Sequence, residues 1–246
     1  NSSSAYYVNN TGANANNRIS GSTFIRGGQP YVAHQTITGL SENLIIINMK
    51  QVNLFSHDLY VVEFSKHNEV KELLGRVVTD YQKISANNNI QHVNTWESIN
   101  NIHTNNALNH VLKSEEVSNF VKETVKSHDI KQGQTVGITR SWFYSVYPGG
   151  CITKKRNTNS FYTGMYFLNA PSKAGSLVIE NPASEFYFSK IHVENKNQYN
   201  SWEQFCPMPE GQIFFVPGYL NHRTTINNEE KDPLNVICFD LEIIQK

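Results

Sequence analysis

The sequence predicts an α+β fold in which helices precede a body of antiparallel strands, most simply a jelly-roll or barrel. Three observations support this prediction. Apolar residues recur at helical spacing between about residues 66 and 127, they alternate with a period of two after Gly133, and turn residues then divide the rest of the chain into short strands. Helices followed by a run of short strands indicate helices packed on one side of a sheet.

The N-terminal segment, residues 1–48, differs in composition from the rest of the chain. Residues 1–28 are rich in Asn, Ser, Thr, Gly and Ala without a sustained period, so this stretch cannot bury enough apolar surface to fold alone. The segment carries scattered side chains that could anchor it to another surface, namely Tyr6, Tyr7, Phe24, Ile25 and Tyr31. We expect either a floppy tail or an extended polar arm that becomes ordered against a partner chain, followed by one domain over residues 49–246.

The helical part of the predicted domain, residues 66–127, follows a strand expected within residues 54–64. The first helix has one apolar stripe at i, i+3, i+4, i+7, i+8 and i+11, formed by Val70, Leu73, Leu74, Val77, Val78 and Tyr81. A second helical zone spans about residues 105–127, where Ser114 can cap a helix whose first turn holds Glu115 and Glu116. One-sided apolar faces are what helices need to cover a sheet.

The main strands are predicted over residues 135–246. From Val136 to Val146 the side chains alternate between larger apolar or aromatic residues and smaller ones, with Arg140 among the first set. Four further strand-like segments are separated by Pro, Gly and Asn-Pro turns, and they lie at residues 162–168, 176–180, 212–216 and 235–244. This pattern is typical of a sheet with one face buried.

Charge and composition limit the possible functions. Lys plus Arg number 21 and Asp plus Glu number 21, so the net charge is zero, which argues against binding nucleic acid mainly by counterion release. The three scattered cysteines, Cys151, Cys206 and Cys238, indicate neither a disulfide framework nor a zinc site. No apolar run exceeds residues 44–47, and no basic-then-apolar leader opens the chain. We expect a soluble intracellular or particle-associated protein, with neither a membrane nor a nucleic acid as partner.

Three stretches of the chain carry a specific pattern. They are SWFYSVYPGG, then NSFYTGMYFL with Gly175 and Asn181-Pro182 behind it, and finally the spacing of Gly211, Pro217 and His222. With these stretches, residues 49–246 resemble the 2-oxoglutarate/iron(II) oxygenases, more narrowly a branch common in marine phages and bacteria. The resemblance implies a double-stranded β-helix, which is a jelly-roll with helices packed on one sheet. It also implies iron held by two His and a carboxylate, or by three His, with open positions for 2-oxoglutarate and dioxygen.

The resemblance assigns the metal positions to Lys155, Asn157 and His222. A protonated Lys has no lone pair and Asn offers only a neutral carbonyl, so His222 alone has the donor that the family uses. The basic residue that holds 2-oxoglutarate falls at Leu234, which cannot clamp a carboxylate. We therefore expect degenerate metal and co-substrate positions and no cofactor, with His222 as a remnant. The alternative is Fe(II) and 2-oxoglutarate at an altered site.

Two other groups of residues could take part in binding. His192, with Glu194, could supply a replacement metal ligand from a loop. The run Lys154, Lys155 and Arg156 is either a solvated loop or a contact for a small anion at the mouth of the barrel.

Two functions of different class follow from these patterns. The first is a non-catalytic, oxygenase-like jelly-roll that acts as a structural or binding module. It would be a phage virion component, tethered to other virion proteins through its N-terminal arm in a homo-oligomer or larger assembly. The second is an active iron(II)/2-oxoglutarate-dependent hydroxylase with an altered metal site. A jelly-roll that binds a carbohydrate or another small ligand remains a third possibility.

Overall fold

The computed structural model describes residues 58–84, 93–182, 194 and 201–245, together with four short strands before residue 50. The chain divides into two compact units, residues 1–57 and residues 58–246. The expected domain boundary, after residue 48, falls inside the first of these units.

The first unit contains two antiparallel strand pairs. Strand β1 (Ala5–Val8) pairs with β4 (Ile46–Met49), and β2 (Thr23–Arg26) pairs with β3 (Gln29–Val32). All of the expected anchor residues lie on these strands: Tyr6, Tyr7, Phe24, Ile25 and Tyr31. The arm thus satisfies part of its backbone by pairing with itself. The structure describes only the backbone of these strands, so the role of the arm as a tether stays a prediction.

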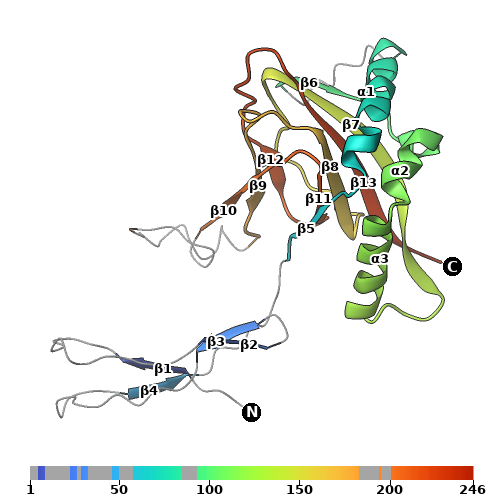
Figure 1. The fold of residues 1–246 in the computed structure, drawn as a ribbon. Coiled ribbons are helices and arrows are strands. Elements are labelled where there is room, and N and C mark those ends of the chain that lie inside the picture. Colours follow the sequence, from blue (N-terminus) through green and yellow to red (C-terminus); the bar gives the residue numbers. More distant parts are fainter. Residues whose placement is uncertain are drawn as a thin grey trace. The chain divides into compact units, whose positions relative to one another are not determined.

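The second unit is built from two antiparallel sheets (Figure 1). The larger has the order β5-β11-β8-β13-β7-β6, with bounds Tyr60–Glu63, Gln212–Pro217, Tyr162–Asn169, Leu234–Gln245, Gln134–Cys151 and Val93–Glu97. The smaller has the order β10-β9-β12, with bounds Glu203–Pro207, Ser176–Glu180 and His222–Thr224. The predicted jelly-roll is confirmed. Strands β6, β10 and β12 were not predicted, because they are short and do not alternate clearly between apolar and polar residues.

The helices cover one face of the larger sheet (Figure 1). They are α1 (His67–Ile84), α2 (Asn109–Leu112) and α3 (Glu115–Ser127), with the short 3₁₀ turns η1 (Ile102–Thr104) and η2 (Asn106–Leu108) before α2. The Ser114 hydroxyl accepts a hydrogen bond from the amide of Val117 at 3.3 Å, which is the predicted cap of α3. None of the described helices is long and apolar enough to span a membrane.

The period of two in β7 separates two hydrophobic cores. Phe143 packs with the helices, whereas Trp142, Tyr144 and Val146 pack between the two sheets. Strand β13 lies between β7 and β8, and β8 needs Gly164 because an added Cβ would lie 2.2 Å from the ring of Phe239 on β13. From Trp142 to Val146 the even-numbered residues of β7 therefore face the interior of the barrel, where the candidate site lies, whereas Val136 and Ile138 pack on the helix side.

Candidate functional site

The segment between β7 and β8 carries the first two predicted metal positions, and β12 carries the third. Lys155 and His222 form a mutual backbone pair, with N···O distances of 2.9 and 2.8 Å. Two residues further on, the backbone N–H of Asn157 donates to the carbonyl of Gly218 at 2.9 Å. Gly218 is required there, since an added Cβ would lie 2.0 Å from the carbonyl oxygen of Ser160. Directly opposed residues of an antiparallel pair project to the same side, so Lys155 and His222 are neighbours.

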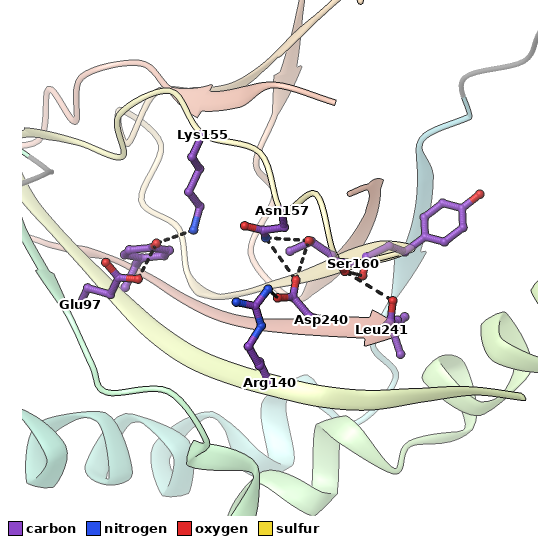
Figure 2. A network of polar contacts seen from close by, with 10 residues as sticks. Glu97, Arg140, Lys155, Asn157, Ser160, Asp240 and Leu241 are labelled. Atoms are coloured by element: carbon purple, nitrogen blue, oxygen red, sulfur yellow. Dashed lines mark hydrogen bonds and ion pairs between the residues drawn. The ribbon is translucent and has the colours of Figure 1, made fainter. Parts of the chain in front are cut away.

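The Lys155 ammonium is held by aromatic residues of β7. Its Nζ donates to the Tyr144 hydroxyl at 2.5 Å and lies 4.6 and 4.7 Å from the ring centroids of Trp142 and Tyr144. The Tyr144 hydroxyl donates onward to Glu97 Oε1 at 2.9 Å. Figure 2 shows the Lys155 side chain extended toward the side of the network where Glu97 lies. Burial lowers the pKa of Lys155 from its usual value. The result is an internal cation in a fixed position.

His222 is a neutral imidazole with one free ring nitrogen. The side chain is 1% exposed, and its Nδ1 lies 3.1 Å from the carbonyl oxygen of Leu220. Because a carbonyl only accepts, Nδ1 carries the proton and Nε2 presents a lone pair. Burial, and secondly the charge of Lys155, lower the pKa of His222 to about 4. Nε2 is buried and has no hydrogen-bond partner in the part of the chain that the structure describes.

Asn157 belongs to a second polar network on the wall of the barrel. Its amide nitrogen donates to Thr163 Oγ1 at 2.8 Å and to Asp240 Oδ1 at 3.1 Å. Thr163 also donates to Asp240 Oδ1, at 2.8 Å, and Arg140 Nη2 lies 2.5 Å from Asp240 Oδ2. Asp240 is fully buried. Figure 2 shows Asn157 and Arg140 approaching this carboxylate from different directions, so the network fixes the orientation of Asn157.

The remaining predicted site residues lie apart from one another. Leu234 is fully buried opposite Val146 and packs in the apolar core between the sheets. Lys154 pairs with Glu180 Oε2 at 2.6 Å, while Lys155 points to Tyr144. Arg156 is exposed. His192 lies outside the described residues.

Sequence reasoning missed the residues that hold Lys155 and Asn157 in place. Asp240 could have been found, because it is a carboxylate within the apolar text VICFDL of the last strand. Arg140 could also have been found, because it occupies an inward position in the alternation of β7. Tyr144 lies in the alternating segment that was predicted as a strand and is buried, but its contact with Lys155 has no local signal.

Comparison with known proteins supports the oxygenase superfamily. Residues 140–240 match the family model described as "Putative 2OG-Fe(II) oxygenase". The chain is similar to HygX from Streptomyces hygroscopicus, solved with nickel, 2-oxoglutarate and hygromycin B bound, at 8% identity and a TM-score of 0.55 over 76% of this chain and 83% of that chain. A prolyl-4-hydroxylase from Pseudomonas putida gives 10% identity and a TM-score of 0.51 over 76% and 94%.

A third similar structure is the epimerase SnoN in complex with Fe3+, alpha ketoglutarate and nogalamycin RO, with 8% identity and a TM-score of 0.52 over 77% of this chain and 82% of that chain. A comparison with curated protein sequences gives no match. The fold is thus that of the 2-oxoglutarate/iron(II) oxygenases, and the family model over residues 140–240 supports the resemblance seen in the sequence. The narrower phage branch stays a prediction.

The prediction of no cofactor is wrong in view of these structures. HygX holds nickel and 2-oxoglutarate, and SnoN holds Fe3+ and alpha ketoglutarate. Two proteins of this fold therefore hold a metal and a 2-oxo acid. The prediction had been drawn from the side chains at a few positions alone.

The three residues at the metal positions do not fit the facial triad of an iron oxygenase. Only the Nε2 lone pair of His222 suits a metal. The Lys155 ammonium has none to offer, and the amide nitrogen of Asn157 is directed to Asp240. Among the described residues, no three His, Cys, Asp or Glu side chains gather where they could hold a metal ion. The fold is thus that of a metal-dependent oxygenase, but the side chains of Lys155 and Asn157 are not metal ligands of the kind that such an enzyme uses.

Proposed function

We propose that this protein is a non-catalytic member of the oxygenase-type jelly-rolls and acts as a binding or structural module. The observation that supports this most directly is the Lys155 ammonium, bonded to Tyr144 at a position where the resemblance places a metal ligand. Two like unit charges 4 Å apart repel by about 4 kcal/mol at an effective dielectric of 20. A Lys at this position therefore opposes the facial-triad arrangement on which hydroxylation depends.

Turnover of 2-oxoglutarate tests this proposal directly. Full-length protein is incubated with Fe(II), ascorbate and 2-oxoglutarate, and succinate is quantified by mass spectrometry. We expect no succinate above the buffer control. Succinate that forms with the wild-type protein and disappears in His222→Ala would overturn the proposal and support the altered hydroxylase instead.

A restored triad gives the matched positive control. The double variant Lys155→His, Asn157→Asp returns imidazole and carboxylate donors next to His222. We expect it to bind Ni(II) at least about 100-fold more tightly than wild type in calorimetric titration, since two protein ligands have been added. Equal Ni(II) affinity of the two proteins would mean that Lys155 and Asn157 do not determine metal binding.

We also propose that the module works within an assembly, as a phage virion component held through its N-terminal unit. Two features support this role: the division of the chain after residue 57 and the aromatic side chains on the strands of the first unit. A protein lacking residues 1–43 should keep the thermal transition of the jelly-roll but lose molar mass in light scattering. Unchanged mass and partner binding after this deletion would contradict the tether.

A further inference from the structure

A groove lies between the edge strand β5 and helix α3, outside the barrel interior. Its volume is about 680 Å3, and its lining combines Tyr60, Val61 and Phe120 with hydroxyl, amide and carboxylate groups. The neighbouring core makes the groove rigid. Phe120 stacks on Phe215 with ring centroids 3.7 Å apart and meets Tyr60 edge-on at 5.4 Å.

The strand that borders the groove, β5, has one edge that no described strand pairs with. Among the described residues, β5 pairs only with β11, so its other edge has no neighbouring strand. Tyr60 is 37% exposed and Val61 47% exposed. A strand edge with apolar side chains and unpaired backbone groups is a template for an incoming strand.

Helix α3 runs along this strand in the opposite direction. Near its N-terminus, Glu116 accepts hydrogen bonds from the amide and hydroxyl of Ser65, at 2.9 and 2.7 Å. One turn later, Phe120 contacts Tyr60, which precedes Ser65 in the strand direction. The helix therefore forms a second wall along the open edge.

The charge of the groove is negative. Glu115, Glu116 and Glu123 line it, and no Lys, Arg or His does among the described residues. Glu116 is held by Ser65, but Glu115 and Glu123 are exposed and form no ion pair within the described part of the chain. They lie eight residues apart on one helix face, which corresponds to about 12 Å along the axis. Residues i and i+4 of an extended strand are about 13 Å apart.

We propose that this groove binds a basic, extended segment of a partner protein, which pairs with β5 as an additional strand. Two Lys or Arg side chains of that segment, four residues apart, would face Glu115 and Glu123, while the residues between them lie over Val61 and Phe120. This proposal deepens the binding role proposed above. It does not depend on the barrel site.

Short labelled peptides test the proposal on the full-length protein. The probe is fluorescein-labelled Lys-Val-Thr-Val-Lys, titrated by fluorescence anisotropy. We expect saturable binding that weakens as salt rises, because exposed ion pairs are screened. The acidic peptide Glu-Val-Thr-Val-Glu should bind at least tenfold more weakly, and N-methylation of the central backbone amides should also weaken binding, because it removes donors to β5.

Variants of the protein complete the experiment. Glu115→Gln with Glu123→Gln should weaken probe binding at least about tenfold, whereas the control Glu69→Gln removes an exposed first-turn charge of α1 and should leave it unchanged. Equal binding of basic and acidic peptides, no effect of the double variant, or no saturable binding would overturn the proposal. Full affinity of the N-methylated peptide would rule out strand pairing. A loss of self-association in the double variant would identify a second copy as the occupant instead.

The peptide and the barrel assays can fail separately. Succinate formation would refute the non-catalytic role even if the peptide binds. Absence of peptide binding would refute the groove proposal even if no succinate forms.

Discussion

The barrel interior and the β5–α3 groove differ in whether their charged side chains have partners within the described chain. Inside the barrel, Lys155 bonds to Tyr144, and Arg140 pairs with the buried Asp240. In the groove, Glu115 and Glu123 face no cation among the described residues. A buried charge must be paired within the fold, because desolvation is costly. An exposed carboxylate stays hydrated, so it can remain unpaired until a partner binds.

The comparison indicates which region serves stability and which serves recognition. Lys155 and Asn157 are bonded within their own chain. Buried atoms of the barrel that have no hydrogen-bond partner in the described part include His222 Nε2, Trp142 Nε1, Arg140 Nε and Asp240 Oδ2, although the last of them lies 2.5 Å from Arg140 Nη2. The groove is preformed but incomplete, since its strand edge and two carboxylates have no partner among the residues that the structure describes. Substitutions should therefore change stability when made in the barrel and binding when made in the groove.

The largest loss of stability is expected from Asp240→Ala. The variant removes the partner of Arg140, Asn157 and Thr163 from a fully buried position. We expect the free energy of unfolding in urea to fall by about 3–4 kcal/mol, toward the lower end of the range for broken buried pairs because Arg140 is partly exposed. The control Asp80→Ala breaks an exposed pair with Lys83 and should cost less than about 0.5 kcal/mol. Equal losses of unfolding free energy in the two variants would mean that the buried network stabilises the fold no more than the exposed pair does.

The pH dependence of stability should reveal the buried His222. Its pKa is about 4 in the folded protein and near 6.5 in the unfolded chain, so between these values the unfolded state binds the proton and the folded state does not. The free energy of unfolding should fall as the pH drops from about 6.5 to about 4, by about 3 kcal/mol in total, and this contribution should then level off. The difference in the free energy of unfolding between wild type and His222→Gln, measured as a function of pH, isolates the contribution of His222. A flat difference curve would contradict the buried, neutral imidazole.

Lys155→Met should alter stability less than either of these changes. Replacing a buried charge by an apolar side chain of similar length is often neutral or stabilising, so we expect a change below about 1.5 kcal/mol. The pKa of His222 should rise, because the charge of Lys155 helps to lower it. Titration of the His222 ring signals by NMR measures this shift. No rise would indicate that burial alone sets the pKa.

The smallest effect is expected in the groove. Glu116→Ala removes two hydrogen bonds from Ser65 and should cost about 1 kcal/mol, whereas Glu115→Ala should cost less than about 0.5 kcal/mol. Burial alone would raise the pKa of Glu116, but the bonds from Ser65 lower it below its usual 4.5. Its contribution is therefore present above pH 4.5 and is lost as the pH falls through the lowered folded value. Equal costs for the two variants would contradict the different roles of these carboxylates.

Local periodicity predicted the larger elements of the fold because each period reports one buried face. The stripe from Val70 to Tyr81 became α1, and the alternation from Val136 to Val146 became part of β7. The pattern failed for β10, which has mostly exposed or half-buried residues, and for the three-residue β12. Such strands are held by pairing with β9, and pairing between distant segments has no local signal.

The sequence by itself determined the jelly-roll with helices on one sheet, and it placed Lys155, Asn157 and His222 at positions where the resemblance expects metal ligands. Only the tertiary structure decided what these side chains do. Tyr144 meets Lys155, and Asp240 meets Asn157 from 83 residues away along the chain. Likewise, Ser65 and Glu116 are 51 residues apart, yet they close one end of the groove. The physical reason is that helix and strand formation depend on neighbouring residues, whereas the partner of a buried charge depends on which distant strands pair.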